Sequence, residues 1–401
     1  MKNEYDVVIA GAGPAGSAAS IHLAGAGLSV LLLEQKRFPR PKLCGEFISP
    51  ECQLHFQSLG VAKAMELSAP AKIVRTSFYG RGGKRVDVPS SSFGGVALGL
   101  SRALMDYNLL ERARQVGVEI LEGAKVSHVL RNTTRVTGLR YKSVDGACEV
   151  SARVVIDATG RNRLLCRKVR DTKTEVKRSK LIAFKAHFTN TKVEPGSCEI
   201  YVYRGGYGGL SSIEGDRANL CFIVNSQVVQ RCGSNPDDVV DHVVMKNRRA
   251  SATLENATRC SEWLSASWER FGGLNPSPIP GLLAIGDSAA FIDPFTGSGM
   301  LMALDSADLV SRSIVLARNK LVSDSDLRNL SADYVREYSR KFSSRLRLCS
   351  FLRYAAFTPL LAESIISLCS ISSSINSLLA RATRGNENQV KSRSPLHIKQ
   401  W

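Results

Sequence analysis

The first part of the chain alternates between short apolar runs and a longer stretch of small residues. The run from Asp6 to Ala10 predicts a buried strand, Ala15 to Ala26 predicts a helix, and Ser29 to Glu34 predicts a second strand. A glycine-rich turn joins the first strand to the helix. This order predicts one βαβ unit and therefore the beginning of a parallel sheet.

Further along, apolar positions recur with strand spacing on both sides of polar turns. Val74 to Tyr79 and Lys84 to Val88 flank a glycine-rich turn and predict a hairpin, and a helix is expected from Arg102 to Val116. Three strands then predict an antiparallel meander that ends at Asp157-Ala158-Thr159-Gly160: residues 124–131, 135–143 and 148–156.

The pattern after residue 165 predicts a separate α+β unit followed by a return to the first domain. Strands are expected at 181–188, 198–203 and 218–224, a helix at 236–249, a strand at 282–285 and a helix at 299–318. The first domain is therefore expected to be discontinuous (1–72, 96–165 and 276–325), with a substrate domain (73–95 and 166–275) and a helical C-terminal region (326–401).

Composition is that of an ordinary globular protein, with 44% hydrophobic and 22% charged residues. The cysteines are scattered, without spacing that suits zinc or a disulfide framework, so no metal site is expected. The first apolar run is broken by glycines after four residues, far short of a secretory signal, which favours a cytoplasmic location.

The formal charge of +18 suggests an anionic partner, and residues 161–180 are especially rich in Lys and Arg. The candidates are cofactor phosphates, a phosphorylated or carrier-bound substrate on an acidic carrier protein, and an anionic membrane surface; a solvated basic face is the plain alternative. No nucleic-acid motif accompanies the charge, so nucleic acid is not expected. The amphipathic tail from Ser331 either lies on a membrane surface or caps the substrate domain.

The turn Gly11-Ala12-Gly13-Pro14-Ala15-Gly16 follows a strand and opens a helix, which is the context of a dinucleotide fingerprint. Its glycines permit a tight turn, and the helix N–H groups face a pyrophosphate. Glu34 ends the second strand, where a carboxylate can accept hydrogen bonds from ribose hydroxyls. This unit alone does not distinguish FAD from NAD.

The segment from Pro280 to Met300 closely resembles the flavin-ribityl motif of aromatic hydroxylases, flavin halogenases and geranylgeranyl reductases. Gly286 and Asp287 follow a strand, so Asp287 is expected to bind a ribityl hydroxyl. Gly297, Gly299 and Met300 begin a helix whose N–H groups and dipole would approach the flavin ring. The resemblance implies an α/β fold: a Rossmann-like FAD-binding domain of the glutathione reductase type, similar to para-hydroxybenzoate hydroxylase, with an inserted α+β substrate domain.

The same resemblance implies further cofactor contacts. Arg102, at a helix start, matches an arginine that reaches the cofactor phosphates, and Val126 matches a position near adenine. Pro41-Lys42-Leu43-Cys44-Gly45-Glu46 is similar to the Lys-x-Cys-Gly segment of geranylgeranyl reductases, so Cys44 is expected beside the flavin, either as an active-site group or as a small buried residue. Glu46 is either a proton relay or a solvated carboxylate.

Asp157-Ala158-Thr159-Gly160 favours the reductase and halogenase side of the superfamily over the hydroxylases. The tryptophans lack the Trp-x-Trp-x-Ile-Pro spacing of halogenases, and residues 207–212 carry Gly209, Ser211 and Ser212 where prenyl reductases have Trp, Phe and Pro. Small residues there would widen a cavity, unless the glycines form a simple turn. The leading hypothesis is NAD(P)H-driven reduction of a C=C bond in a lipophilic substrate. The alternatives are flavin monooxygenation of an aromatic or quinone-like ring, and a flavin-bound membrane-surface or partner-binding protein.

Overall fold

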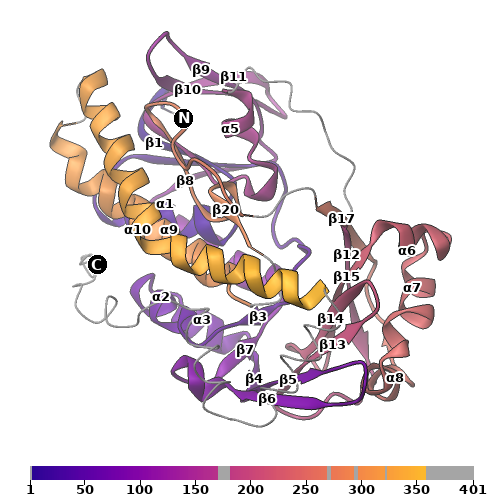
Figure 1. Cartoon of the computed structure of the whole chain (residues 1–401). Coiled ribbons are helices and arrows are strands. Elements are labelled where there is room, and N and C mark those ends of the chain that lie inside the picture. Colours follow the sequence, from indigo (N-terminus) through magenta and orange to yellow (C-terminus); the bar gives the residue numbers. More distant parts are fainter. Residues whose placement is uncertain (1, 170–180, 269–271, 293–296, 321–322, 358–401) are drawn as a thin grey trace.

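The protein folds as two mixed α and β parts that lie side by side, with a long C-terminal helix crossing one of them (Figure 1). The computed structural model describes residues 2–169, 181–268, 272–292, 297–320 and 323–357. Within these residues, no helix combines the length and the apolar character that crossing a membrane requires.

The first part contains a seven-stranded sheet in the order β8-β2-β1-β11-β10-β9, with β19 paired to β11. Strands β8, β2, β1, β11 and β19 run parallel, whereas β10 is antiparallel to both β11 and β9. The strands are β1 (Glu4–Ala10), β2 (Val30–Glu34), β8 (Glu119–Glu122), β9 (Lys125–Arg131), β10 (Val136–Ser143), β11 (Gly146–Asp157) and β19 (Leu282–Ala284).

The parallel strands are apolar almost throughout because helices cover the sheet. Helix α1 (Pro14–Gly25) packs against α9 (Gly299–Ala317) and α4 (Arg102–Gln115). Helix α10 (Asp324–Phe357) lies along α9 (Figure 1), and its buried Tyr334 donates a hydrogen bond to the carbonyl of Ala284 at 2.7 Å. The first half of α10 is thus part of the core of this first part. The helix also contacts β14 (Gly206–Ser212) of the second sheet.

The second part contains an eight-stranded sheet in the order β16-β12-β15-β14-β13-β5-β6, with β17 paired to β12. This sheet, called the substrate sheet below, is antiparallel except for the parallel β5-β13 pair. Its strands are β5 (Arg75–Tyr79), β6 (Arg85–Pro89), β12 (Leu181–Thr189), β13 (Ser197–Tyr203), β14 (Gly206–Ser212), β15 (Ala218–Asn225), β16 (Thr258–Arg259) and β17 (Leu264–Trp268).

The central strands of the substrate sheet, β12 to β15, are buried on both faces. Phe184, Phe222 and Tyr201 point to one face, where helices α6 (Ser226–Arg231), α7 (Pro236–His242) and α8 (Arg248–Leu254) cover them (Figure 1). Trp263 packs edge-on against Phe184, Phe188 and Phe222 on this face, with ring centroids 5.6–6.4 Å apart. The opposite face looks toward the first part of the molecule.

Small elements connect the two parts. A three-stranded sheet is formed by β3 (Phe47–Ile48), β7 (Ala97–Gly99) and β4 (Ala71–Ile73). The remaining elements are α2 (Cys52–Ser58), α3 (Ala62–Leu67), α5 (Leu164–Lys168), the pair β18 (Gly272–Gly273) and β20 (Ala290–Phe291), and short 3-10 helices at 90–93, 160–162, 244–246, 286–288 and 318–320.

The structure decides one alternative that the sequence left open and corrects one expectation. Residues 207–212 do not form a simple turn; they lie in β14, between β13 and β15. The helix expected at 236–249 is broken, because Asn247 caps α8 with its side-chain oxygen while its amide donates to the carbonyls of Tyr79 and Val202, at 3.1 Å each.

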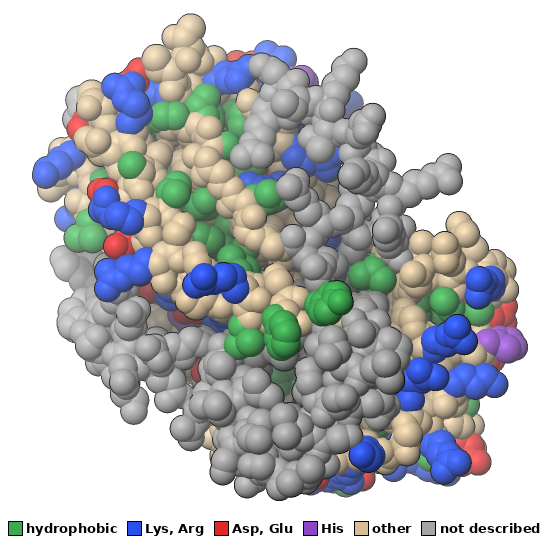
Figure 2. Space-filling model, in the orientation of Figure 1, with side chains coloured by type: hydrophobic (Ala, Val, Ile, Leu, Met, Phe, Trp, Pro, Cys, Tyr) green, Lys and Arg blue, Asp and Glu red, His purple; other side chains and the backbone are tan. Residues whose placement is uncertain are grey.

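On the face that Figure 2 shows, the positive charge of the described residues is spread out rather than gathered. Figure 2 shows Lys and Arg side chains over both halves of the visible face, and much of the basic segment 161–180 lies outside the described residues. Among the described residues on this face, the pattern is that of a solvated basic surface.

Candidate functional site

The glycine turn after β1 is shaped by two close approaches. Gly11 has a φ of 103°, and a Cβ there would lie 2.4 Å from the carbonyl oxygen of Ala158. A Cβ on Gly16 would lie 1.8 Å from the carbonyl oxygen of Gly11. Both positions therefore require glycine, and Gly16 serves the packing of the turn rather than the cavity wall. Gly11, Gly13, Pro14 and Ala15 line a cavity of about 940 Å³.

Glu34 is held at the edge of this cavity. Its carboxylate is almost fully buried and accepts hydrogen bonds from the backbone N–H groups of Ala12 and Lys36, both at 2.9 Å. The β1–α1 turn and the end of β2 are thereby locked together. The carboxylate keeps lone pairs for hydroxyl donors in the cavity, as the sequence predicted for a ribose.

An arginine pair stands beside the start of α1. Arg102 donates two hydrogen bonds to Asp106, at 2.7 and 2.8 Å, and Arg40 lies 3.4 Å from the same carboxylate. The buried Nε of Arg40 has no hydrogen-bond partner within the described residues. A buried donor without a partner is costly, so this corner suits an anionic group such as a phosphate.

The second glycine turn meets the first one. Gly286 has a φ of 55°, and a Cβ there would lie 3.0 Å from Cβ of Ala15. Its N–H donates to Ser306 Oγ at 2.8 Å. Gly297, Gly299 and Met300 line the same cavity at the beginning of α9, whereas residues 293–296 lie outside the described part of the chain.

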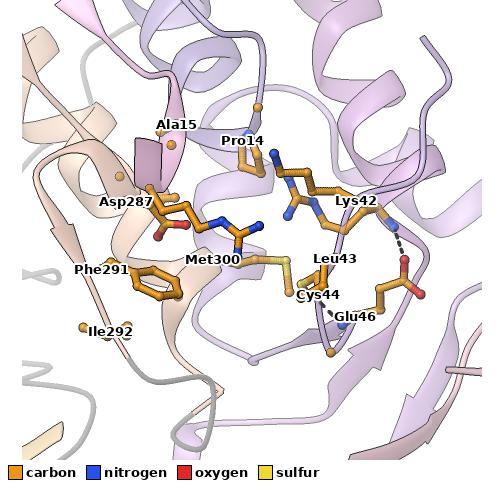
Figure 3. Close-up of a pocket in the computed structure, with 18 of the residues that line it drawn as sticks. Pro14, Ala15, Lys42, Leu43, Cys44, Glu46, Asp287, Phe291, Ile292 and Met300 are labelled. Atoms are coloured by element: carbon orange, nitrogen blue, oxygen red, sulfur yellow. Dashed lines mark hydrogen bonds between the residues drawn. The ribbon is translucent and has the colours of Figure 1, made fainter. Parts of the chain in front are cut away.

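Asp287 faces the cavity between these two turns (Figure 3). Burial raises the pKa of its carboxyl, while the cations of Arg102, Lys42 and Arg161 oppose that rise. Its carboxylate takes part in none of the hydrogen bonds formed within the described residues. A carboxylate in this state is suited to accept hydrogen bonds from hydroxyls of a bound molecule.

The segment from Lys42 to Phe47 forms another wall of the cavity. The N–H of Glu46 donates to Cys44 Sγ at 3.4 Å, and Asn219 on β15 donates to the carbonyl of Cys44 at 3.0 Å. Figure 3 shows Cys44 and Met300 near each other at the cavity, with Phe291 on another side. Burial lowers the pKa of Lys42, and nearby Arg40, Arg102 and Arg161 lower it further.

Glu46 is fully buried, so of the two alternatives for it the solvated carboxylate is wrong. It receives three hydrogen bonds, from Lys185 Nζ at 2.7 Å, from His187 Nε2 at 2.6 Å and from the backbone N–H of Arg102 at 2.8 Å. Burial acts to raise the pKa of Glu46, but His187 and Lys185 together hold it below its ordinary value. Its φ of 56° is rare for a residue with a side chain.

The Glu46 carboxylate therefore joins three elements. Lys185 and His187 belong to β12 of the substrate sheet, and Arg102 opens α4. In Figure 3 the Glu46 side chain extends away from Phe291 and Asp287. Its place is that of an interdomain anchor, and we call Glu46, Lys185 and His187 the anchor cluster.

The cavity continues from the two glycine turns to the substrate sheet. Apolar side chains dominate this second half, supplied by several strands and one 3-10 helix: Phe47, Phe78, Val86, Val88, Phe93, Ile200, Tyr207, Ile223 and Phe291. One cavity therefore has a polar, cationic half shaped by tight turns and an apolar half that belongs to the substrate sheet.

Among the residues predicted to contact a cofactor, all but Gly16 line this one cavity. Val126 on β9 does so together with Ala124 and Lys125, and Cys44 and Arg102 do so as well. Sequence reasoning missed Arg40, Lys42 and Arg161. Lys42 lies within the Pro41–Glu46 segment, and Arg161 directly follows Asp157-Ala158-Thr159-Gly160. Both could therefore have been found from the sequence.

These features fit one class of molecule. The Nε of Arg40, which has no partner among the described residues, and the cations around it suit phosphates. The carboxylates of Glu34 and Asp287 suit two sets of hydroxyls, and the glycine turns permit close backbone approach. A long dinucleotide with a polyhydroxyl linker, as in FAD, satisfies all of these requirements.

The sequence profile of the FAD binding domain family matches residues 4–318. Two curated relatives are similar over most of the chain. The 1H-pyrrole-2-carbonyl-[peptidyl-carrier protein] brominase of Pseudoalteromonas luteoviolacea is 28% identical, over 77% of this chain and 78% of its own. The menaquinone reductase of Mycobacterium tuberculosis is 27% identical, over 90% of this chain and 86% of its own.

A solved structure shares the fold. The geranylgeranyl bacteriochlorophyll reductase-like protein of Thermoplasma acidophilum superimposes with a TM-score of 0.77, at 19% identity over 97% of this chain and 98% of that protein. The fold and the resemblance expected from the sequence are thereby confirmed. The chain belongs to the FAD binding domain family, and it is an FAD-dependent oxidoreductase.

Proposed function

We propose that the protein uses FAD, reduced by NAD(P)H, to reduce a C=C bond in a lipophilic substrate. The observation that carries the proposal is the cavity whose polar, cationic half, called the cofactor cradle below, continues into an apolar half on the substrate sheet. Ligand cavities of this kind are mainly apolar, with few polar groups that fix orientation. A lipophilic molecule in this half would lie directly beside the flavin.

The chain's own residues would bind and orient rather than react. Bound FAD would supply the hydride chemistry. Asp287 would hold the hydroxylated linker and Arg40 and Arg102 the phosphates, while other cavity residues would surround the reacting end (Met300, Cys44 and Phe291). Apolar side chains such as Phe78 and Ile200 would exclude water from the substrate half.

The names of two similar proteins support this proposal, since one is a menaquinone reductase and the other is reductase-like. The brominase is named for a carrier-linked substrate. For this chain, a phosphate or carrier linkage on the substrate is a secondary proposal, supported by the cations of Lys42, Arg161 and Lys168 at the cavity.

The test is anaerobic reduction of the flavin by NADPH and by NADH, followed by addition of lipophilic substrates. We expect one of the nicotinamides to bleach the flavin, and a prenylated lipid or quinone to restore its colour without oxygen. The product should stay two hydrogens heavier than the substrate after air has reoxidised any quinol to the quinone, because only a reduced C=C bond keeps them. If turnover requires oxygen and the product is one oxygen atom heavier than the substrate, the reaction is a monooxygenation and this proposal is wrong.

A further inference from the structure

Helix α10 has an inward face that packs on the protein. Tyr334, Tyr338, Phe342 and Cys349 are buried on this face. The first three rings follow one another along the helix, with centroids 5.9 and 4.5 Å apart. This packing accounts for the apolar positions of the helix, but it leaves the opposite face of α10 unexplained.

The outward face of α10 carries one continuous stripe. Arg336, Arg340, Arg347, Phe351 and Tyr354 follow one another at intervals of four, seven, four and three residues, which places them on the same side of a helix. All five are exposed, and the two aromatic residues are 57% and 63% accessible to solvent. We call these five residues the outer stripe.

The charge along the outer stripe has one sign. After Glu337, α10 carries five basic residues and no acidic one: Arg340, Lys341, Arg345, Arg347 and Arg353. Arg336 and Arg340 pair with Asp333 and Glu337, at 2.8 and 3.8 Å, and Arg347 has no acidic partner within the described residues. Exposed ion pairs of this kind contribute little free energy, so the guanidinium groups stay available to an external anion.

The aromatic rings distinguish the outer stripe from the spread charge of the same face. Single exposed apolar residues are ordinary, but Phe351 and Tyr354 lie one turn apart and directly follow Arg347. Figure 2 shows hydrophobic side chains gathered beside Lys or Arg side chains over this part of α10. Rings and guanidinium groups are favoured at membrane interfaces, because the rings lie at the level of the headgroups and the cations bind lipid phosphates.

The stripe ends beside the apolar half of the cavity. Helix α10 contacts β18 and β14, and Leu346 Cδ1 would lie 3.1 Å from a Cβ on Gly273. In Figure 1 the end of α10 reaches the substrate sheet near β14. That strand supplies Tyr207 and Gly209 to the cavity wall. A surface that binds the end of α10 is therefore brought close to the part of the protein that surrounds the cavity.

We propose that the outer stripe docks the protein on an anionic membrane surface. Arg340 and Arg347 bind lipid phosphates, and Phe351 and Tyr354 enter the interface. An acidic protein would pair the arginines but leave the two rings in water. The inference goes beyond the proposed function, although the choice of a lipid surface rests in part on the proposed lipophilic substrate, which the same membrane would supply.

The test is flotation of the FAD-loaded, full-length protein with two kinds of vesicle. One is phosphatidylcholine alone, and the other is phosphatidylcholine mixed with phosphatidylglycerol. The charge variant combines Arg340→Gln with Arg347→Gln, and the aromatic variant combines Phe351→Ser with Tyr354→Ser. Flavin content and the urea midpoint show that each variant is folded, and the single variants serve if a double variant is not.

Each double variant has a matched control on another part of the surface. Arg204→Gln combined with Arg248→Gln removes the same charge from exposed positions of the substrate domain. Val144→Ser combined with Leu316→Ser removes two apolar side chains that are 87% and 86% exposed.

The wild type is expected to float with the mixed vesicles and not with phosphatidylcholine alone, and added salt should weaken its binding. The charge variant should bind the mixed vesicles about tenfold or more weakly, and the aromatic variant about fivefold or more weakly. Both controls should match the wild type. Equal binding of the wild type to the two kinds of vesicle overturns the inference, as does a stripe variant that floats like the wild type or a control that loses as much binding.

Polyglutamate tests the other occupant. If the wild type does not float with anionic vesicles but binds polyglutamate through Arg340 and Arg347, the outer stripe serves an acidic protein and the membrane proposal is wrong.

The inference and the proposed function fail separately, because flotation needs neither nicotinamide nor substrate. If neither NADPH nor NADH reduces the flavin while flotation depends on the outer stripe, the proposed reaction is wrong and the membrane surface stands. If a detergent-dissolved substrate is reduced but the protein does not bind anionic vesicles, the membrane surface is wrong and the reaction stands.

Discussion

At the scale of single residues, two carboxylates in the same region have opposite surroundings. Glu46 receives three hydrogen bonds from protein groups, whereas Asp287 receives none within the described residues. Asp287 was predictable because its strand, turn and glycines are contiguous in sequence. The partners of Glu46 were not, because Lys185 and His187 lie on a distant strand and only the folded chain brings them together.

Asp287→Ala is expected to weaken FAD binding by about tenfold or more. One hydrogen bond to a charged group contributes roughly 1.5–3 kcal/mol, and alanine removes the acceptor. The measurement is flavin absorbance per protein after gel filtration, with a fluorescence titration of the apoprotein. Asp145→Ala, in an exposed turn, is the control; a colourless wild type, or full flavin in Asp287→Ala, would show that the ribityl assignment is wrong.

Glu46→Gln is expected to lower the free energy of unfolding by about 3–5 kcal/mol. The substitution keeps the shape of the side chain but leaves the buried ammonium of Lys185 without its counter-charge. Urea denaturation measures the change. The control is Glu66→Gln, which breaks an exposed pair with Lys63 and should cost no more than about 1 kcal/mol. Equal losses in both variants would show that the anchor cluster does not stabilise the fold.

At the scale of elements, β14 shows why a local pattern can mislead. Its glycines are unfavourable in strands and typical of turns, yet the strand is paired on both sides. A Cβ on Gly206 would lie 1.9 Å from the carbonyl oxygen of Ile223, and one on Gly208 would lie 2.8 Å from Phe222 Cβ. The glycines are needed for close approach of neighbouring strands, and that requirement is visible only when the neighbours are known.

Helix α1 carries a titratable group that opposes folding in acid. His22 is buried, and neither ring nitrogen has a hydrogen-bond partner within the described residues. Burial lowers the pKa of His22 from 6.5 to about 4, because the charged form is poorly solvated there. Between these two values the unfolded chain binds a proton that the folded chain does not, so stability falls as pH falls through this window.

The variant His22→Leu should remove this dependence. From pH 7 to pH 4 the wild type is expected to lose about 3 kcal/mol more unfolding free energy than the variant. The reason is that a difference of one bound proton between the unfolded and folded chains changes stability by roughly 1.4 kcal/mol for each step of one in pH. Urea titrations at several pH values measure the loss. His128→Asn, on an exposed position of β9, should follow the wild type; parallel pH profiles for wild type and His22→Leu would contradict the assignment.

At the scale of the whole molecule, the order of elements was predictable and the junction between the two parts was not. The return of the chain to the first sheet at β19 follows from a second glycine motif that is visible in the sequence. The junction depends on the anchor cluster and on Asn219 reaching Cys44, which are pairs of residues without any local signal.

The anchor cluster is expected to make the two parts unfold together. In a protein where Trp268 and Trp401 are replaced by Phe, Trp263 reports on the substrate sheet, and flavin release reports on the cofactor cradle. The two thermal transitions should coincide in the otherwise wild-type chain. They should separate when Lys185→Met and His187→Gln are combined; coincident transitions in that variant would show that other contacts couple the parts.

The pairing of β19 with β11 also sets the order of events during synthesis. The last parallel strand of the first sheet is translated only after all of the substrate sheet, and the ribosome adds roughly 5–20 residues per second. The nascent chain therefore waits on the order of ten seconds with the edge of β11 uncovered and the second glycine turn still unmade. During that interval it cannot hold the cofactor, and the uncovered edge is exposed to aggregation unless a chaperone shields it.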